Sequence, residues 1–194
     1  AKHTLRIEEE HGLTAIGLEP AFAINQLAFL LQTDAGNILW ECLSIVTENA
    51  VAALKARGGV DMIVISHPHF YASMVAWSEA FGGVPIYLHE ADRAWVQYPS
   101  PLIRLWSGDG LQLSDDVTLI RAGGHFDGSS VLHWRNAPGG VSCMPQPMCQ
   151  TGESLSSAPG VGAVFTLSKR SQDFCAQMAG FPAYAVFSQS NFWA

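Results

Sequence analysis

The chain has 194 residues, of which 48% are apolar and only 14% charged, and its formal net charge is −7 at pH 7. This length suits one domain with a sizeable core, and so apolar a composition excludes a disordered chain. A negative chain with few Lys and Arg residues argues against a nucleic-acid groove or an anionic membrane surface as partner. We find no signal peptide, no apolar run of membrane-spanning length and no C-x-x-C pair among the four cysteines. We therefore expect a cytoplasmic protein with reduced thiols.

The first hundred residues predict alternating strands and helices, which is the pattern of an α/β fold. Residues 1–20 are interpreted as an irregular N-terminal arm with a short strand at its end. Strands are expected within 21–32, 38–43, 61–66 and 85–88, the first of them with a bulge at Asn25-Gln26. Helices are expected from Thr47 to about 57, over 72–81 and over 90–97, and glycine pairs follow the first two.

The second half of the chain has shorter apolar runs. Short strands separated by turn residues are expected at 102–106, 112–113, 117–121 and 131–134. A glycine-rich loop over 123–130 carries His125 at its centre. Residues 136–166 show no clear period and are interpreted as an irregular stretch, after which we expect a helix over 167–179 and a strand over 184–188.

Two histidines one residue apart, His67 and His69, follow the apolar strand expected at 61–66. In extended backbone, residues i and i+2 point the same way, so both imidazoles can aim at one point, as a metal site requires. A metal needs three or four ligands, however, and this pair supplies two. On spacing alone, two loop histidines bonded to the backbone are the alternative.

The order of these elements resembles the metallo-β-lactamase superfamily. The likeness is carried by the His67-Pro68-His69 segment, by the histidine that ends the next strand, and by the Gly-Gly-His loop, and it covers roughly 20–134. It implies an α/β fold of the αββα four-layer sandwich type, formed by one domain over 1–194 and incomplete at its C-terminus.

The resemblance also implies a set of metal ligands. His67, His69 and His125 match the ligands of the family's first metal position. Glu153, in the segment Thr151-Gly152-Glu153-Ser154, stands where the family has a bridging Asp.

Two positions of the H-x-H-x-D-H motif depart from the family. Tyr71 stands where the motif has Asp, and Ala72 stands where it has His. A neutral phenol is a poor ligand at neutral pH and an alanine is none, so the second metal position loses its characteristic ligands.

The chemistry implied is that of a metal-dependent hydrolase with one ion, zinc first and iron or manganese as alternatives. A metal-activated water would attack an ester, lactone, amide or phosphoester of a small-molecule substrate. Glu153 would act as fourth ligand or base, and Tyr71 would donate a hydrogen bond to an oxyanion or leaving group. A non-catalytic, degenerate member that binds a metal or ligand is the alternative, and redox or sulfur chemistry at a single iron is a third. The composition also allows a homodimer.

Other residues have a structural and a functional interpretation. His89, at the end of the strand over 85–88, is either a structural histidine or a residue behind the metal ligands. Asp127 is either a metal ligand or a loop cap, and we expect the cap; His133 is expected to be a plain strand residue. The tryptophans are expected mainly in the core, with one or two at the cleft: Trp77, Trp95, Trp106 and Trp134.

Overall fold

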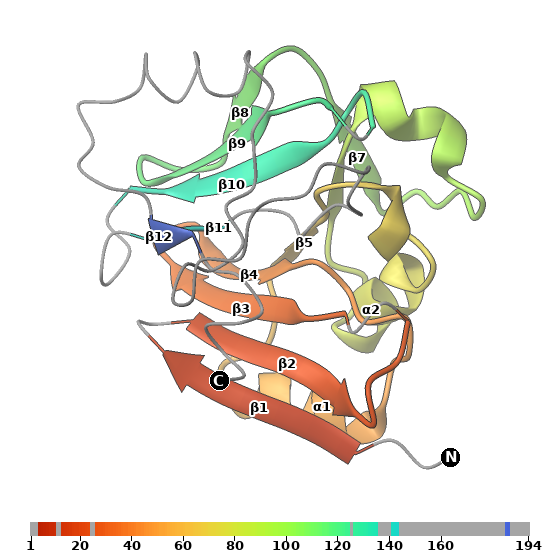
Figure 1. The fold of residues 1–194 in the computed structure, drawn as a ribbon, viewed down its shortest axis with the longest axis vertical. Coiled ribbons are helices and arrows are strands. Elements are labelled where there is room, and N and C mark those ends of the chain that lie inside the picture. The colour runs from red at the N-terminus through yellow and green to blue at the C-terminus, as the bar shows by residue number, and fades with distance from the viewer. Residues whose placement is uncertain are drawn as a thin grey trace, which may run out of the picture.

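The computed structural model describes residues 4–10, 13–23, 26–124, 126–135, 141–143 and 185–186. Within these residues the strands form two sheets (Figure 1). The larger sheet contains, in spatial order, β1 (Thr4–Glu10), β2 (Leu13–Glu19), β3 (Ala28–Thr33), β4 (Gly36–Trp40), β5 (Met62–Val64), β6 (Ile86–His89) and β7 (Ile103–Trp106). The smaller sheet has the order β12 (Ala185–Val186), β11 (Val141–Cys143), β10 (Ser130–Trp134), β9 (Val117–Arg121) and β8 (Gly110–Gln112).

The larger sheet is mixed. Strands β1 to β4 run antiparallel in sequence order, and β4 to β7 run parallel. Parallel neighbours need crossover connections, and the helices lie in these connections. Helix α1 (Glu48–Lys55) joins β4 to β5, η1 (Pro68–Phe70) and α2 (Met74–Ala80) join β5 to β6, and the 3₁₀ helix η2 (Glu90–Trp95) joins β6 to β7.

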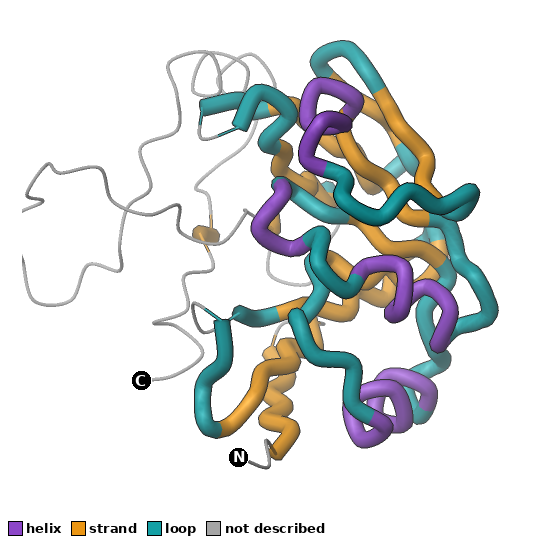
Figure 2. Tube along the Cα trace, turned by 90° about the vertical axis from the view of Figure 1, so that its right-hand side faces the viewer, coloured by secondary structure: helices purple, strands orange, loops and turns teal. Residues whose placement is uncertain are grey.

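The larger sheet buries both of its faces. Alternate residues of β3 and β4, such as Leu30 and Leu39, pack with Leu54 of α1 and Trp77 of α2. Their neighbours Leu31 and Ile38 face the other way and pack against Val117, Leu119, Leu132 and Trp134 of the smaller sheet. Helices α1 and α2, the larger sheet and the smaller sheet therefore form three successive layers. Figure 2 shows the helical segments spread along the molecule from top to bottom. The residues 167–179, expected to form a further helix, lie outside the described residues. Among the helices that are described, none is long and apolar enough to cross a membrane.

The irregular N-terminal arm is wrong for residues 4–10, which form β1, whereas the strand expected at its end is present as β2. Strand β1 pairs antiparallel with β2 from Thr4↔Glu19 to Glu10↔Leu13. Residues 13–18 of β2 are all buried, so this strand shows no alternation between apolar and polar faces. Leu5 and Ile7 of β1 pack on the same cluster as α1 and α2.

The expected strand over 21–32 begins only at Ala28, so Gln26 lies outside it and forms no bulge in it, while Asn25 lies outside the described residues. Ala23 has a positive φ of 39°, and the Gln26 side chain is buried and hydrogen-bonded across the loop. The helix expected over 90–97 is the shorter 3₁₀ helix η2, and the strand expected at 112–113 is β8, which ends at Gln112. The other strands and helices expected before residue 135 are confirmed to within three residues at each end. Strand β11 lies inside the stretch 136–166 that was interpreted as irregular, so that interpretation is wrong at 141–143. It pairs parallel with β12, which stands where a strand was expected at 184–188.

Three connections meet at one edge of the larger sheet. They are the segments after β5 and β6 and the loop between β9 and β10. Ser130 N–H donates to the Ser66 carbonyl oxygen at 3.0 Å, and Gly128 N–H donates to the Asp92 carboxylate at 2.8 Å. These bonds tie the smaller sheet to the ends of β5 and β6.

Candidate metal and catalytic site

His67 and His69 lie side by side at the end of β5. Their ring centroids are 5.0 Å apart with an interplanar angle of 69°. His67 has extended backbone and precedes Pro68. Pro68 is the first residue of η1, and His69 is the second. The two rings therefore lie on either side of the start of a 3₁₀ helix. The extended backbone expected to carry both histidines does not reach His69, because β5 ends at Val64.

The two imidazoles differ in exposure and in support. His67 is buried, and its Nδ1 lies 2.6 Å from the Ser66 hydroxyl. His69 is exposed, but its carbonyl oxygen accepts a hydrogen bond from Gln26 Nε2 at 3.1 Å. Gln26 Oε1 accepts hydrogen bonds from the Ser44 N–H at 2.9 Å and from the Ser44 hydroxyl at 2.7 Å. Gln26 thus fixes the η1 backbone against the segment that follows β4.

The predicted ligands are described only in part. His125 and Glu153 lie outside the described residues, so their predicted roles stay predictions. Among the residues that are described, no group of three or more His, Cys, Asp and Glu side chains could hold a metal ion. Phe126, the neighbour of His125, is described, and its ring stacks on His67 at 5.8 Å and meets His69 edge-on at 5.3 Å. The loop that carries His125 therefore reaches the histidine pair.

A buried carboxyl group lies against Ser66, the residue before His67, and was missed in the sequence. Glu41 follows β4, has a positive φ of 68° and is completely buried. Both of its carboxylate oxygens lie 3.3 Å from Ser66 N. Burial raises the pKa of Glu41 to about 8, against a smaller lowering by the Ser66 hydrogen bonds. A charged residue inside the apolar run 38–43 was the available signal.

Tyr71, which stands at the Asp position of the family motif, ends η1 and is only 8% exposed. Burial raises the pKa of its phenol well above the usual value, and the Asp92 and Glu41 carboxylates raise it further. The side chain is therefore a neutral phenol at physiological pH, able to donate a hydrogen bond and unsuited to bind a metal as phenolate.

Asp92 is the second residue that the sequence did not reveal. It is 1% exposed in η2, and its Oδ1 accepts the Gly128 N–H. A Cβ at position 128 would lie 2.7 Å from Asp92 Cγ and 2.9 Å from His89 Cβ, so this close approach requires a glycine. Asp92 Oδ2 is buried and has no hydrogen-bond partner among the described residues.

His89 has a structural role. Its Nδ1 accepts from the Ala91 N–H at 3.1 Å, its Nε2 lies 3.0 Å from the Gly108 carbonyl oxygen, and its ring meets Trp106 edge-on. Because a carbonyl oxygen only accepts, Nε2 carries the proton and both nitrogens are occupied.

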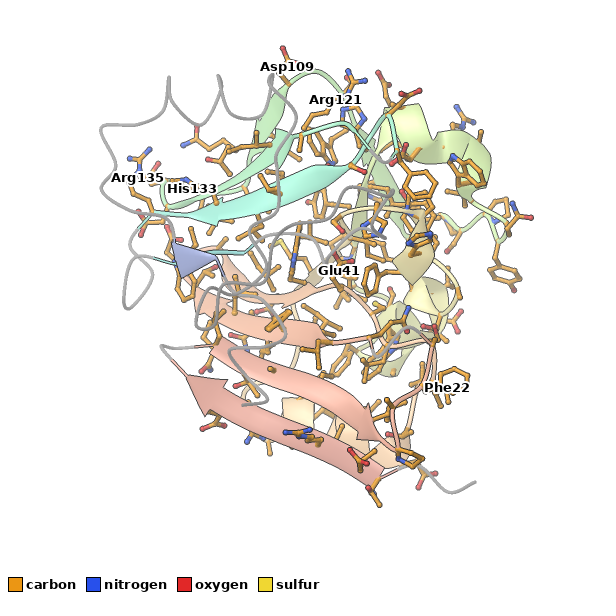
Figure 3. The ribbon with its side chains drawn as sticks, viewed as in Figure 1. Phe22, Glu41, Asp109, Arg121, His133 and Arg135 are labelled. Atoms are coloured by element: carbon orange, nitrogen blue, oxygen red, sulfur yellow. The ribbon has the colours of Figure 1, made fainter. Side chains whose placement is uncertain are left out.

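Figure 3 places His133 near Arg135, at the end of β10 opposite to the loop that carries His125.

One aromatic side chain stands at the surface beside the site. Trp77, Trp106 and Trp134 are buried, as expected for the core. Trp95 of η2 is 54% exposed, and its ring meets Phe126 edge-on at 5.2 Å. The rings of Trp95 and Phe126 form a wall that leads from solvent to the histidine pair.

Comparisons with known proteins establish the fold. No family model matches the sequence. The uncharacterized protein YmaE of Bacillus subtilis (strain 168) is 43% identical over 143 residues, which are 74% of this chain and 52% of that protein, so the chain spans about half the length of this curated relative. The structure of TTHA1623 in a di-iron-bound form matches with a TM-score of 0.60 at 18% identity, covering 86% of this chain and 88% of that one. The metallo-β-lactamase DIM-1 matches with a TM-score of 0.54 at 15% identity, covering 67% and 65%. The expected α/β class is thereby confirmed, and the chain has the metallo-β-lactamase fold.

Proposed function

We propose that this chain is a metal-dependent hydrolase in which His67, His69 and His125 hold one divalent ion. The observation that carries the proposal is the pairing of two imidazoles at the end of β5, with ring centroids 5.0 Å apart. Ser66 at His67 Nδ1 supplies the partner on the second ring nitrogen that metal-binding imidazoles usually have. Gln26 restrains the backbone of His69, and Phe126 brings the His125 loop to both rings.

The donor set suits a first-row divalent ion. Imidazole nitrogens bind zinc and also iron, and TTHA1623 is described in a di-iron-bound form. When bound, such an ion lowers the pKa of a coordinated water toward neutrality and polarises a carbonyl or phosphoryl oxygen. Glu153, assigned by resemblance, would complete the ligand set or act as base.

The described residues have further roles in this proposal. Tyr71, kept neutral by burial, donates its hydroxyl proton in a hydrogen bond to a developing oxyanion or a leaving oxygen. The Trp95 and Phe126 wall excludes water from one side and accommodates an apolar part of an ester, lactone, amide or phosphoester.

The second candidate is a module that binds a metal or ligand without catalysis. The residues that favour it are Tyr71 and Ala72, which replace the acid and the histidine of the family motif. The two candidates share the metal site and differ only in turnover.

Elemental analysis of the purified protein tests the metal site. We expect about one zinc, iron or manganese per chain in the wild type and a loss of that metal in the His67→Ala/His125→Ala double variant. His133→Ala, at the far end of β10, is the matched control and should retain the metal. Absence of metal in the wild type after reconstitution would refute the proposal. Hydrolysis of p-nitrophenyl butyrate or γ-butyrolactone that a chelator abolishes would then separate the hydrolase from the binding module.

A further inference from the structure

Glu41 carries a carboxyl group into the interior of the molecule (Figure 3), where it is completely buried. Its backbone N–H donates to the Val64 carbonyl oxygen at 3.0 Å, a bond that needs no carboxyl group. Among the described residues, the hydrogen bonds to this carboxyl come from Ser66, and no cationic side chain forms an ion pair with it. A buried carboxyl group without an opposite charge costs stability, and such a cost is expected where a residue serves function.

Ser66 joins this carboxyl group to the first histidine of the pair. Its N lies 3.3 Å from both carboxylate oxygens of Glu41, and its hydroxyl lies 2.6 Å from His67 Nδ1. The Ser66 hydroxyl also lowers the pKa of Glu41, as expected of a hydroxyl that donates to a carboxylate. Ser66 and His67 are each 1% exposed, and the Ser66 carbonyl oxygen accepts the Ser130 N–H at 3.0 Å. Carboxylate, hydroxyl and imidazole therefore form a chain of contacts on a backbone that is held from both sides.

The direction of the hydrogen bonds in this chain decides which nitrogen of His67 carries the proton. A hydroxyl has one proton, and a carboxylate can only accept. When the Ser66 hydroxyl donates to Glu41, its oxygen accepts from His67, so that Nδ1 carries the imidazole proton and Nε2 keeps its lone pair. A neutral imidazole binds a metal ion through the nitrogen without a proton.

We propose that Glu41 is a positioning residue that acts through Ser66 and keeps His67 in the tautomer whose Nε2 can bind a divalent ion. The inference rests on the proposed metal site and adds to it a buried acid from outside the histidine motif. A neutral residue of the same shape would cost less to bury, but it would not fix the direction of the Ser66 hydroxyl.

Three substitutions separate this role from support of the fold. In Glu41→Gln, the amide oxygen can still accept the Ser66 N–H, while the NH₂ group donates to the Ser66 hydroxyl and turns its proton toward His67 Nδ1. Ser66→Ala removes the hydroxyl and keeps the backbone N–H that bonds Glu41. Ser73→Ala is the matched control, because it removes a serine hydroxyl that donates to the Leu43 carbonyl oxygen at 2.6 Å.

The tautomer of His67 is measured in the metal-free protein by ¹⁵N NMR of its imidazole. At about pH 9 the imidazole is neutral, and Glu41, whose pKa burial raises to about 8, is mostly ionised. We expect the proton on Nδ1 in the wild type and in Ser73→Ala, on Nε2 in Glu41→Gln, and without this preference for Nδ1 in Ser66→Ala. A proton on Nε2 in the wild type, or the same tautomer in Glu41→Gln as in the wild type, would overturn the inference.

The affinity for Zn²⁺, measured by competition with a chelator, is the second test. We expect it to fall at least tenfold in Glu41→Gln and in Ser66→Ala, the usual effect of removing a partner of a metal-binding imidazole, and to be unchanged in Ser73→Ala. Because Glu41 acts through Ser66, adding Glu41→Gln to Ser66→Ala should cost no further affinity. Losses that multiply in the double variant would show that Glu41 acts independently of Ser66, against the inference.

Urea unfolding of the metal-free proteins distinguishes positioning from support of the fold. Glu41→Gln replaces a buried charge with a neutral amide, so at about pH 9 it should unfold at the same urea concentration as the wild type or at a higher one. A lower unfolding midpoint together with weaker Zn²⁺ binding would assign Glu41 to the fold and overturn the inference. A wild type that binds no Zn²⁺ refutes the proposed metal site itself, whereas Zn²⁺ binding with an unchanged tautomer in Glu41→Gln refutes the role of Glu41 alone.

Discussion

Gly128→Ala tests how closely the η2 segment and the β9–β10 loop are packed together. The added Cβ would lie 2.7 Å from Asp92 Cγ, 2.8 Å from Asp92 Oδ2 and 2.9 Å from His89 Cβ. Carbon atoms in contact prefer about 3.5–4.0 Å, so the loop or Asp92 must move. His89 cannot yield easily, because both of its ring nitrogens are hydrogen-bonded.

The cost follows from two terms. Overpacking a tight site costs about 1–3 kcal/mol, and weakening a hydrogen bond to a buried carboxylate costs about 1.5–3 kcal/mol. Moving the loop relieves the first term and increases the second, so we expect a loss of roughly 2–5 kcal/mol in the free energy of unfolding. With a urea m-value of about 2 kcal/mol/M, the midpoint of urea unfolding falls by roughly 1–2.5 M.

A double-mutant cycle with Asp92→Ala identifies the cause. Part of the cost should disappear in the Asp92→Ala background, because two of the three close contacts are with Asp92. Gly59→Ala is the control: its φ is +81° and nothing lies within 4 Å, so it should cost about 1–2 kcal/mol for backbone conformation and show no coupling to Asp92. A change below about 0.5 kcal/mol in Gly128→Ala would refute the packing argument, since that is the scale of an unconstrained surface change.

Three further predictions concern the surroundings of the histidine pair. Gln26→Ala leaves the His69 carbonyl without its donor and should lower the free energy of unfolding by about 1–3 kcal/mol and weaken Zn²⁺ binding in calorimetric titration; unchanged Zn²⁺ affinity would show that Gln26 does not position His69. Trp95→Ala alters an exposed side chain and should change stability by less than about 0.5 kcal/mol, yet raise KM for p-nitrophenyl octanoate more than for the acetate; equal changes would exclude an apolar subsite. Glu41 has its pKa raised from 4.5 to about 8 on folding, so the folded state holds this proton more tightly than the unfolded chain. Its contribution to stability is complete below pH 4.5 and is lost as pH rises through about 8, by up to roughly 1.4 kcal/mol per unit. Glu41→Gln should remove this slope in urea melts of the metal-free protein between pH 5 and 8, and equal slopes in both proteins would contradict the assignment.

The apolar periodicity predicted most of the α/β core but not the N-terminal hairpin. Leu5 and Ile7 alternate with polar residues, a pattern typical of a strand that our interpretation of this segment as an arm overlooked. Residues 13–18 of β2, by contrast, are all buried and show no period of two. A strand covered on both sides has the same pattern as any short apolar run, so only its pairing with β1 and β3 identifies it.

Some residues of the candidate site could be predicted from the sequence, and others could not. His67 and His69 could be found because only Pro68 separates them in sequence and they follow a buried strand. Glu41, Asp92 and Gly128 act on the site through contacts between residues 25 and 36 positions apart, for which a single sequence gives no signal. The i, i+2 spacing predicted that the His67 and His69 rings lie side by side, and they do. The reason given, an extended strand through both residues, is wrong, because His69 lies in the 3₁₀ helix η1.

The contacts that hold the site are directed at backbone groups. Gln26 bonds the carbonyl of His69, Glu41 accepts the N–H of Ser66, and Asp92 accepts the N–H of Gly128. Such contacts fix the path of the loops whatever side chains they carry. The side chains at 71 and 72 can therefore change from an acid and a histidine without displacing the histidine pair. Under the proposed function, metal binding by the histidines and the chemistry beside them would therefore vary separately, so metal content and turnover are measured as independent quantities.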